Sequence, residues 1–122
     1  MNESTSPLAV RALEALCATL KECGYTREKI IHFLGRLQGE GGLDLDPITE
    51  LRVTAALRSQ RSVLGNPTQS FKVKAFFALC SGLWAHGGFP APRRIESITA
   101  FLRDLREEGA VDLLKLFQTL EM

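Results

Sequence analysis

Residues 68–86 have the sequence TQSFKVKAFFALCSGLWAH, in which positions 75–85 carry no charged side chain. Large apolar residues recur at helical spacing on one side of this stretch: Val73, Phe76, Phe77, Cys80, Leu83 and Trp84. Small residues form a second stripe, which would let another helix approach closely: Ala75, Ala78, Gly82 and Ala85. Because a helix that is apolar nearly all round is typically buried, we predict that residues 68–86 form the central helix, with only Lys72 and Lys74 reaching water.

Five further segments with helical periodicity surround this stretch, and Gly and Pro separate them. They cover approximately residues 7–23, 26–38, 46–64, 93–108 and 110–120. A chain of 122 residues is long enough for one domain with a single core. We therefore expect an all-α fold, a compact bundle of five to six short helices around residues 68–86. Residues 7–122 would form a single helical domain, and residues 1–6 a flexible N-terminus.

Each surrounding segment has a predicted apolar face. The face of residues 7–23 consists of Leu13, Leu16, Leu20 and Cys23. The face of residues 26–38 consists of Ile30, Phe33, Leu34 and Leu37. The third is Ile48, Val53, Ala55, Ala56, Leu57, Val63 and Leu64. The last two are Ile95, Ile98, Leu102 and Leu105, then Val111, Leu114, Phe117 and Leu120, with Leu113 and Leu116 widening the final one.

The sequence predicts a cytoplasmic protein without a membrane segment. Residues 1–6 lack the basic and apolar regions of a signal peptide. No uninterrupted apolar run approaches the roughly 20 residues that a spanning helix needs. The three cysteines, Cys17, Cys23 and Cys80, have no C-x-x-C spacing, so we expect reduced thiols instead of a redox or metal site.

Patterns typical of catalysis or metal binding are missing from the sequence. His32 and His86 are the only histidines, and neither lies in a known local signature of nucleophilic catalysis. Residues 44–46 match a calcium loop only at its start, and the glycine-rich residues 39–42 follow a helix instead of a strand. We therefore predict no enzymatic activity, no metal, no cofactor and no small-molecule substrate.

Charge is strongly segregated along this nearly neutral chain, whose formal net charge is +1. Residues 51–95 contain no Asp or Glu, but seven basic residues: Arg52, Arg58, Arg61, Lys72, Lys74, Arg93 and Arg94. A local basic field attracts phosphates or acidic protein surfaces. A short turn should hold Arg58, Arg61, Lys72 and Lys74 at one corner. Arg93 and Arg94 would join them only if the bundle folds back.

A second basic face is expected on the helix at residues 26–38, where Lys29, His32 and Arg36 lie away from its apolar side. The glycine-containing corner at residues 23–26 fits both the turn of a helix-turn-helix and an ordinary helical hairpin. Phe71 is the only aromatic residue among the basic ones, so base stacking of the single-strand type is not indicated. Trp84, His86 and Phe89 are either core residues or an anchor for a partner.

Two functions are compatible with this charge pattern. The first is a non-enzymatic nucleic-acid-associated protein, a small subunit of a larger nucleoprotein complex that uses the basic corner on the backbone of DNA or RNA. The second is a protein-protein adaptor or regulator, which docks an acidic partner or self-associates through its segregated charges. A third interpretation is that the basic side chains simply keep the protein in solution.

Overall fold

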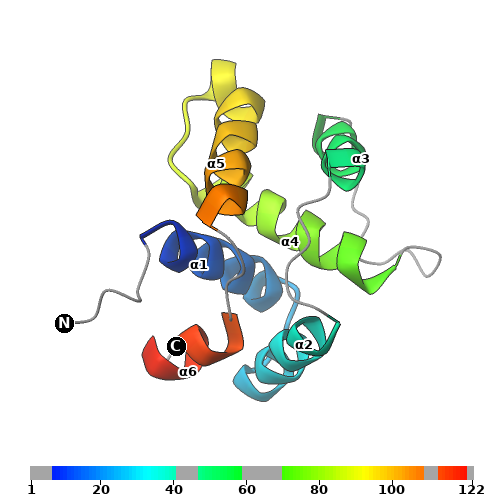
Figure 1. The fold of residues 1–122 in the computed structure, drawn as a ribbon, viewed down its shortest axis with the longest axis vertical. Coiled ribbons are helices and arrows are strands. Elements are labelled where there is room, and N and C mark those ends of the chain that lie inside the picture. The colour runs from blue at the N-terminus through cyan, green and yellow to red at the C-terminus, as the bar shows by residue number, and fades with distance from the viewer. Residues whose placement is uncertain (1–6, 41–46, 59–69, 109–112, 121–122) are drawn as a thin grey trace.

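In the computed structural model, the described residues are 7–40, 47–58, 70–108 and 113–120, and helices are the only regular secondary structure that they form (Figure 1). The six α-helices are α1 (Pro7–Glu22), α2 (Arg27–Gly39), α3 (Pro47–Arg58), α4 (Phe71–His86), α5 (Arg94–Glu108) and α6 (Leu113–Leu120). A 3₁₀ turn, η1 (Ala91–Arg93), precedes α5. The predicted all-α fold is confirmed. The predicted N-terminal segment at residues 1–6, the glycine-rich residues 41–42 and residues 59–67 lie outside the described residues.

Local capping determines where several helices begin and end. The Thr26 hydroxyl accepts a hydrogen bond from the Lys29 amide at 3.3 Å, and that of Ser70 accepts one from the Val73 amide at 3.2 Å. These contacts satisfy amides that have no partner within the helix. The central helix therefore begins at Phe71, later than predicted. At the other end of α1, Gly24 has φ of 90° and reverses the chain into α2.

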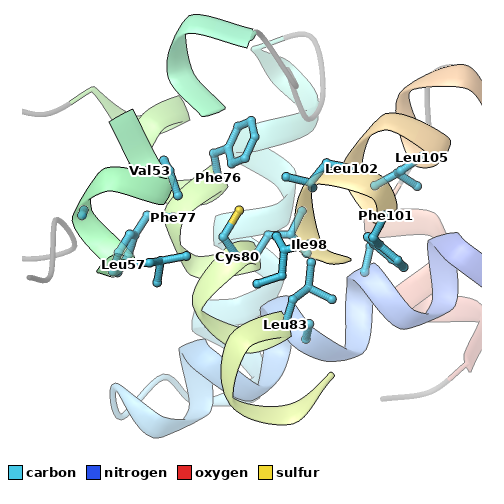
Figure 2. Close-up of a cluster of buried hydrophobic side chains, with 14 residues drawn as sticks. Val53, Leu57, Phe76, Phe77, Cys80, Leu83, Ile98, Phe101, Leu102 and Leu105 are labelled. Atoms are coloured by element: carbon cyan, nitrogen blue, oxygen red, sulfur yellow. The ribbon is translucent and has the colours of Figure 1, made fainter. Parts of the chain in front are cut away.

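The central position of α4 is confirmed. Figure 1 shows α3 and α5 on one side of α4, and α1, α2 and α6 on the other. On the first side, Phe76 and Cys80 of α4 lie in a buried cluster with Val53 of α3 and Ile98 of α5 (Figure 2). The other side contributes Ala75 and Ala78 to a second cluster with the apolar faces of α1, α2 and α6. Both sides of α4 are thus removed from water, as its sequence without charge requires.

The stripe of small residues brings α1 close to α4, as predicted. A Cβ atom added to Gly82 would overlap the carbonyl group of Ala15. The buried Thr19 hydroxyl donates a hydrogen bond across this contact to the Ala78 carbonyl oxygen at 2.8 Å, and the Ala15 carbonyl oxygen lies 3.2 Å from it. The backbones of α1 and α4 are therefore so close that the short side chain of Thr19 lies within hydrogen-bonding distance of carbonyl oxygens from both helices.

Several predicted faces need correction where an element ends. Cys23 lies beyond the end of α1 and is exposed, and Ala55 of α3 is exposed while Val53, Ala56 and Leu57 are buried. In α6 the buried residues are Leu113 and Phe117, whereas Leu120 is 39% exposed. Water also reaches the last turn of α4, where Ala85 and His86 are exposed. Helical periodicity places residues on a face, but it does not show how far the neighbouring helix extends.

Among the described residues, no helix has both the length and the apolar character needed to cross a membrane.

Candidate nucleic-acid interface

Of the four residues in the predicted basic corner, the structure describes the side chains of Lys72 and Lys74. These two side chains project from different sides of α4. Consecutive residues of an α-helix are rotated by about 100°, so residues two apart point about 160° away from each other. Both lysines are partly exposed and follow Phe71, the first residue of α4. Arg61 and the side chains of Arg52 and Arg58 lie outside the described residues.

Arg93 and Arg94 lie at the other end of α4. The Arg94 guanidinium carbon is 4.9 Å from the ring centroid of Trp84, in the last turn of α4. Trp84 follows Lys74 by about 15 Å along the helix axis at 1.5 Å per residue. Arg94 also has a buried Nε atom without a hydrogen-bond partner, so it belongs to the packing of α5 on α4. Arg93 is exposed at the end of η1.

Arg36 links the two predicted basic groups. Its guanidinium carbon lies 4.2 Å from the centroid of the Phe71 ring, which is a cation–π distance. Its Nε atom donates a hydrogen bond to a carboxylate oxygen of Glu40 at 3.1 Å. This contact places the outer face of α2 next to the start of α4, where Lys72 and Lys74 are found.

The outer face of α2 carries a line of basic side chains. Lys29, His32 and Arg36 are all exposed, and their spacing puts them on one side of the helix, beside buried Phe33, which is four residues from Lys29 and three from Arg36. At 1.5 Å per residue this line is about 10 Å long. We call Lys29, His32, Arg36, Phe71, Lys72 and Lys74 the α2–α4 surface. Glu28 and Glu40 are the acidic residues of α2 and its C-cap, so cations outnumber carboxylates there.

Beneath this surface runs a row of aromatic rings that the sequence did not reveal. Phe71 and Phe33 have ring centroids 4.8 Å apart, and Tyr25 meets Phe33 edge to face at 6.0 Å. Tyr25 is 36% exposed. Phe33 lies between His32 and Arg36 in the sequence, but its contact with Phe71 depends on how α2 packs against α4, which the local sequence does not show.

A groove of about 340 Å³ lies between α1 and the C-terminal end of α4. Its lining residues are Arg11, Glu14, Ala15, Ala18, Leu83, His86 and Gly87. Arg11, which the sequence analysis did not single out, donates a hydrogen bond to the Gly87 carbonyl oxygen at 3.0 Å. Its guanidinium carbon also lies 5.3 Å and 5.2 Å from the ring centroids of Phe89 and Phe101.

The rim of this groove carries both signs of charge. His86 Nε2 lies 2.9 Å from a carboxylate oxygen of Glu22, and Glu14 lines the same groove as Arg11. Phe89 is partly buried against the cluster that contains Phe76 and Cys80 of α4. The contacts of Arg11 and His86 therefore connect α1 with the end of α4. The described residues of the groove have no excess of positive charge that would attract an anion.

The cysteines form no disulfide. Cys17 and Cys80 are buried, whereas Cys23 is exposed. Burial raises the pKa of the Cys17 thiol to about 11, and the nearby Lys21 charge only partly opposes this effect. Cys17 is therefore a protonated, apolar core residue at neutral pH. Among the described residues, no group of three or more His, Cys, Asp or Glu side chains is arranged to hold a metal ion.

Comparisons of this chain with protein-family models, with curated proteins and with solved structures found no match. Its function must therefore be argued from its own residues.

Proposed function

We propose that this protein is a non-enzymatic nucleic-acid-associated protein that contacts the phosphate backbone through the α2–α4 surface, as a small subunit of a larger nucleoprotein complex. The observation that carries this proposal is the contact of Arg36 with Phe71. It places the basic side chains of α2 beside the first turn of α4, where Lys72 and Lys74 project on different sides of the helix. Neither of the two basic groups alone would neutralise more than a few phosphates.

The electrostatics of the surface support a polyanionic ligand. The first turn of α4 contains no acidic residue, and the N-terminal end of a helix dipole is positive, which adds to the field of Lys72 and Lys74. Lys29 is exposed, so it can reach a phosphate without the cost of opening the core. Each neutralised phosphate releases counterions, which makes such binding steeply dependent on salt.

The test is fluorescence anisotropy of a labelled oligonucleotide across a series of salt concentrations. The charge-reversal variant Lys29→Glu/Lys72→Glu is expected to abolish binding at low salt. The matched control is Arg103→Glu/Lys115→Glu, which reverses two exposed cations on α5 and α6. The proposal is wrong if the wild-type protein does not bind at low salt, or if both double variants weaken binding equally.

A role as a protein-protein adaptor or regulator is the second candidate. It is favoured by exposed apolar side chains, since Leu51 of α3 is 70% exposed and Leu120 of α6 is 39% exposed. Light scattering over a range of concentrations tests self-association, and Leu51→Glu should abolish it if α3 is the contact.

We also propose a cytoplasmic location. The three cysteines are free, and a reducing compartment keeps such thiols from forming disulfides.

A further inference from the structure

The guanidinium group of Arg36 is held in place and remains accessible. One of its faces covers the Phe71 ring, and its Nε edge is bonded to Glu40 at 3.1 Å. The Arg36 side chain is nevertheless 63% exposed. The planar face that points away from Phe71 is therefore open to a ligand, and guanidinium planes are surfaces on which nucleic-acid bases stack.

Tyr25 offers a second flat surface at the other end of the same aromatic row. Its ring packs edge to face on Phe33, and its backbone amide donates a hydrogen bond to the Leu20 carbonyl oxygen at 3.0 Å. The left-handed Gly24 before it and the N-cap Thr26 after it fix the course of the chain. A ring that is anchored in this way and 36% exposed loses little conformational entropy when a base stacks on it.

Three basic side chains of α2, Lys29, His32 and Arg36, follow one line, whereas Arg27 lies over the Phe117 ring of α6. Lys29 and His32 lie on the outer side of α2 between the Tyr25 end and Arg36. Such a line can follow one phosphate backbone. A duplex presents two backbones with its bases stacked inside, so it would leave both flat surfaces unused.

We infer that the ligand of the α2–α4 surface is single-stranded nucleic acid, with one base stacked on the Arg36 guanidinium and another on the Tyr25 ring. This inference rests on the proposed function and specifies its ligand. It differs from the sequence-based interpretation, in which base stacking of the single-strand type was not indicated. Lys29 and the lysines of α4 neutralise phosphates of the backbone, and the two stacking positions distinguish a single strand from a duplex.

The experiment compares a labelled single strand with the blunt duplex of the same length and sequence, by anisotropy at low and moderate salt. The single strand is expected to bind more tightly. Arg36→Lys keeps the positive charge but removes the planar guanidinium group, and Tyr25→Ala removes the aromatic ring. Each is expected to weaken single-strand binding about five- to tenfold, within the range for loss of one stacked base, with little effect on the duplex.

Two controls make this result specific. Arg103→Lys is the same substitution at an exposed arginine of α5 and should leave the binding of both probes unchanged. Circular dichroism melting of each variant checks that α2 still packs on α4. Tyr25→Phe, which keeps the flat ring, should restore most of the affinity that Tyr25→Ala loses.

The possible failures are distinguishable. If single strand and duplex bind equally, and both are lost in Lys29→Glu/Lys72→Glu, backbone binding holds but the stacking inference is wrong. Unchanged single-strand affinity in Arg36→Lys and Tyr25→Ala also overturns the inference. Absence of binding to either probe overturns the proposed function together with the inference.

Discussion

Gly82 of α4 and Ala15 of α1 are in such close backbone contact that not even a methyl group fits between them. This contact positions α1 against the central helix, and Thr19 closes it with a hydrogen bond to Ala78. The largest contact between helices in the described residues is thus built from small side chains and backbone atoms, which makes it sensitive to very small substitutions.

Gly82→Ala is expected to lower the free energy of unfolding by about 2 kcal/mol, because the added methyl group meets backbone that cannot rotate away. This cost exceeds the gain of about 1 kcal/mol that alanine brings to a helix interior. Gly35→Ala is the matched control. An added Cβ there lies 3.9 Å from Leu114, an ordinary contact, so this variant should be slightly stabilised. Urea unfolding of both variants tests whether the free energy of unfolding falls in Gly82→Ala and rises in Gly35→Ala.

Thr19→Val keeps the shape of the side chain but removes the hydrogen bond donor. We expect a loss of about 1 kcal/mol, since the buried carbonyl oxygen of Ala78 loses this partner. The control is Thr119→Val on the exposed face of α6, which should change stability very little. Equal unfolding midpoints for wild type and Thr19→Val would contradict the role given to the hydroxyl.

Arg11→Ala is expected to destabilise the protein by about 1 kcal/mol, because it removes a hydrogen bond and packing on two aromatic rings. Arg103→Ala, at an exposed position of α5, serves as the comparison and should stay within about 0.5 kcal/mol of wild type. Thermal unfolding followed by circular dichroism is sufficient for the measurement. If the two variants have the same stability, Arg11 does not connect α1 to the end of α4.

The cysteines should differ in reactivity. At neutral pH a thiol reagent is expected to modify exposed Cys23 rapidly, and to modify Cys17 only as the protein unfolds, since burial raises the Cys17 pKa to about 11. Mass spectrometry of labelled peptides identifies the modified residue. Rapid labelling of Cys17 under native conditions would contradict its buried position.

The same pKa shift predicts a loss of stability at alkaline pH. The folded protein keeps the Cys17 proton up to about pH 11, whereas an unperturbed thiol has a pKa of 9.0. The folded state therefore binds more protons than the unfolded state in that window, and stability falls as the pH rises through it. Cys17→Ala should show a smaller fall over the same pH range, measured by urea unfolding at each pH.

Much of the fold was predictable from local sequence. The run without charge at residues 75–85 identified the central helix, and the small residues Ala78 and Gly82 identified where a second helix approaches. These predictions succeeded because a helix places residues on its faces by a fixed rotation, whatever surrounds it. Predicted faces were wrong mainly at the ends of elements, as at Cys23 and Leu120, where burial depends on the reach of a neighbouring helix.

The sequence by itself determined the all-α class, the central helix and the segregation of charge. Only the tertiary structure decided which basic residues lie together. It separates Arg94 from Lys72 by the length of α4 and brings Arg36 onto Phe71. The physical reason is that helical periodicity acts over a few residues, whereas the contact of Arg36 with Phe71 depends on how α2 packs against the first turn of α4. No local pattern specifies that packing.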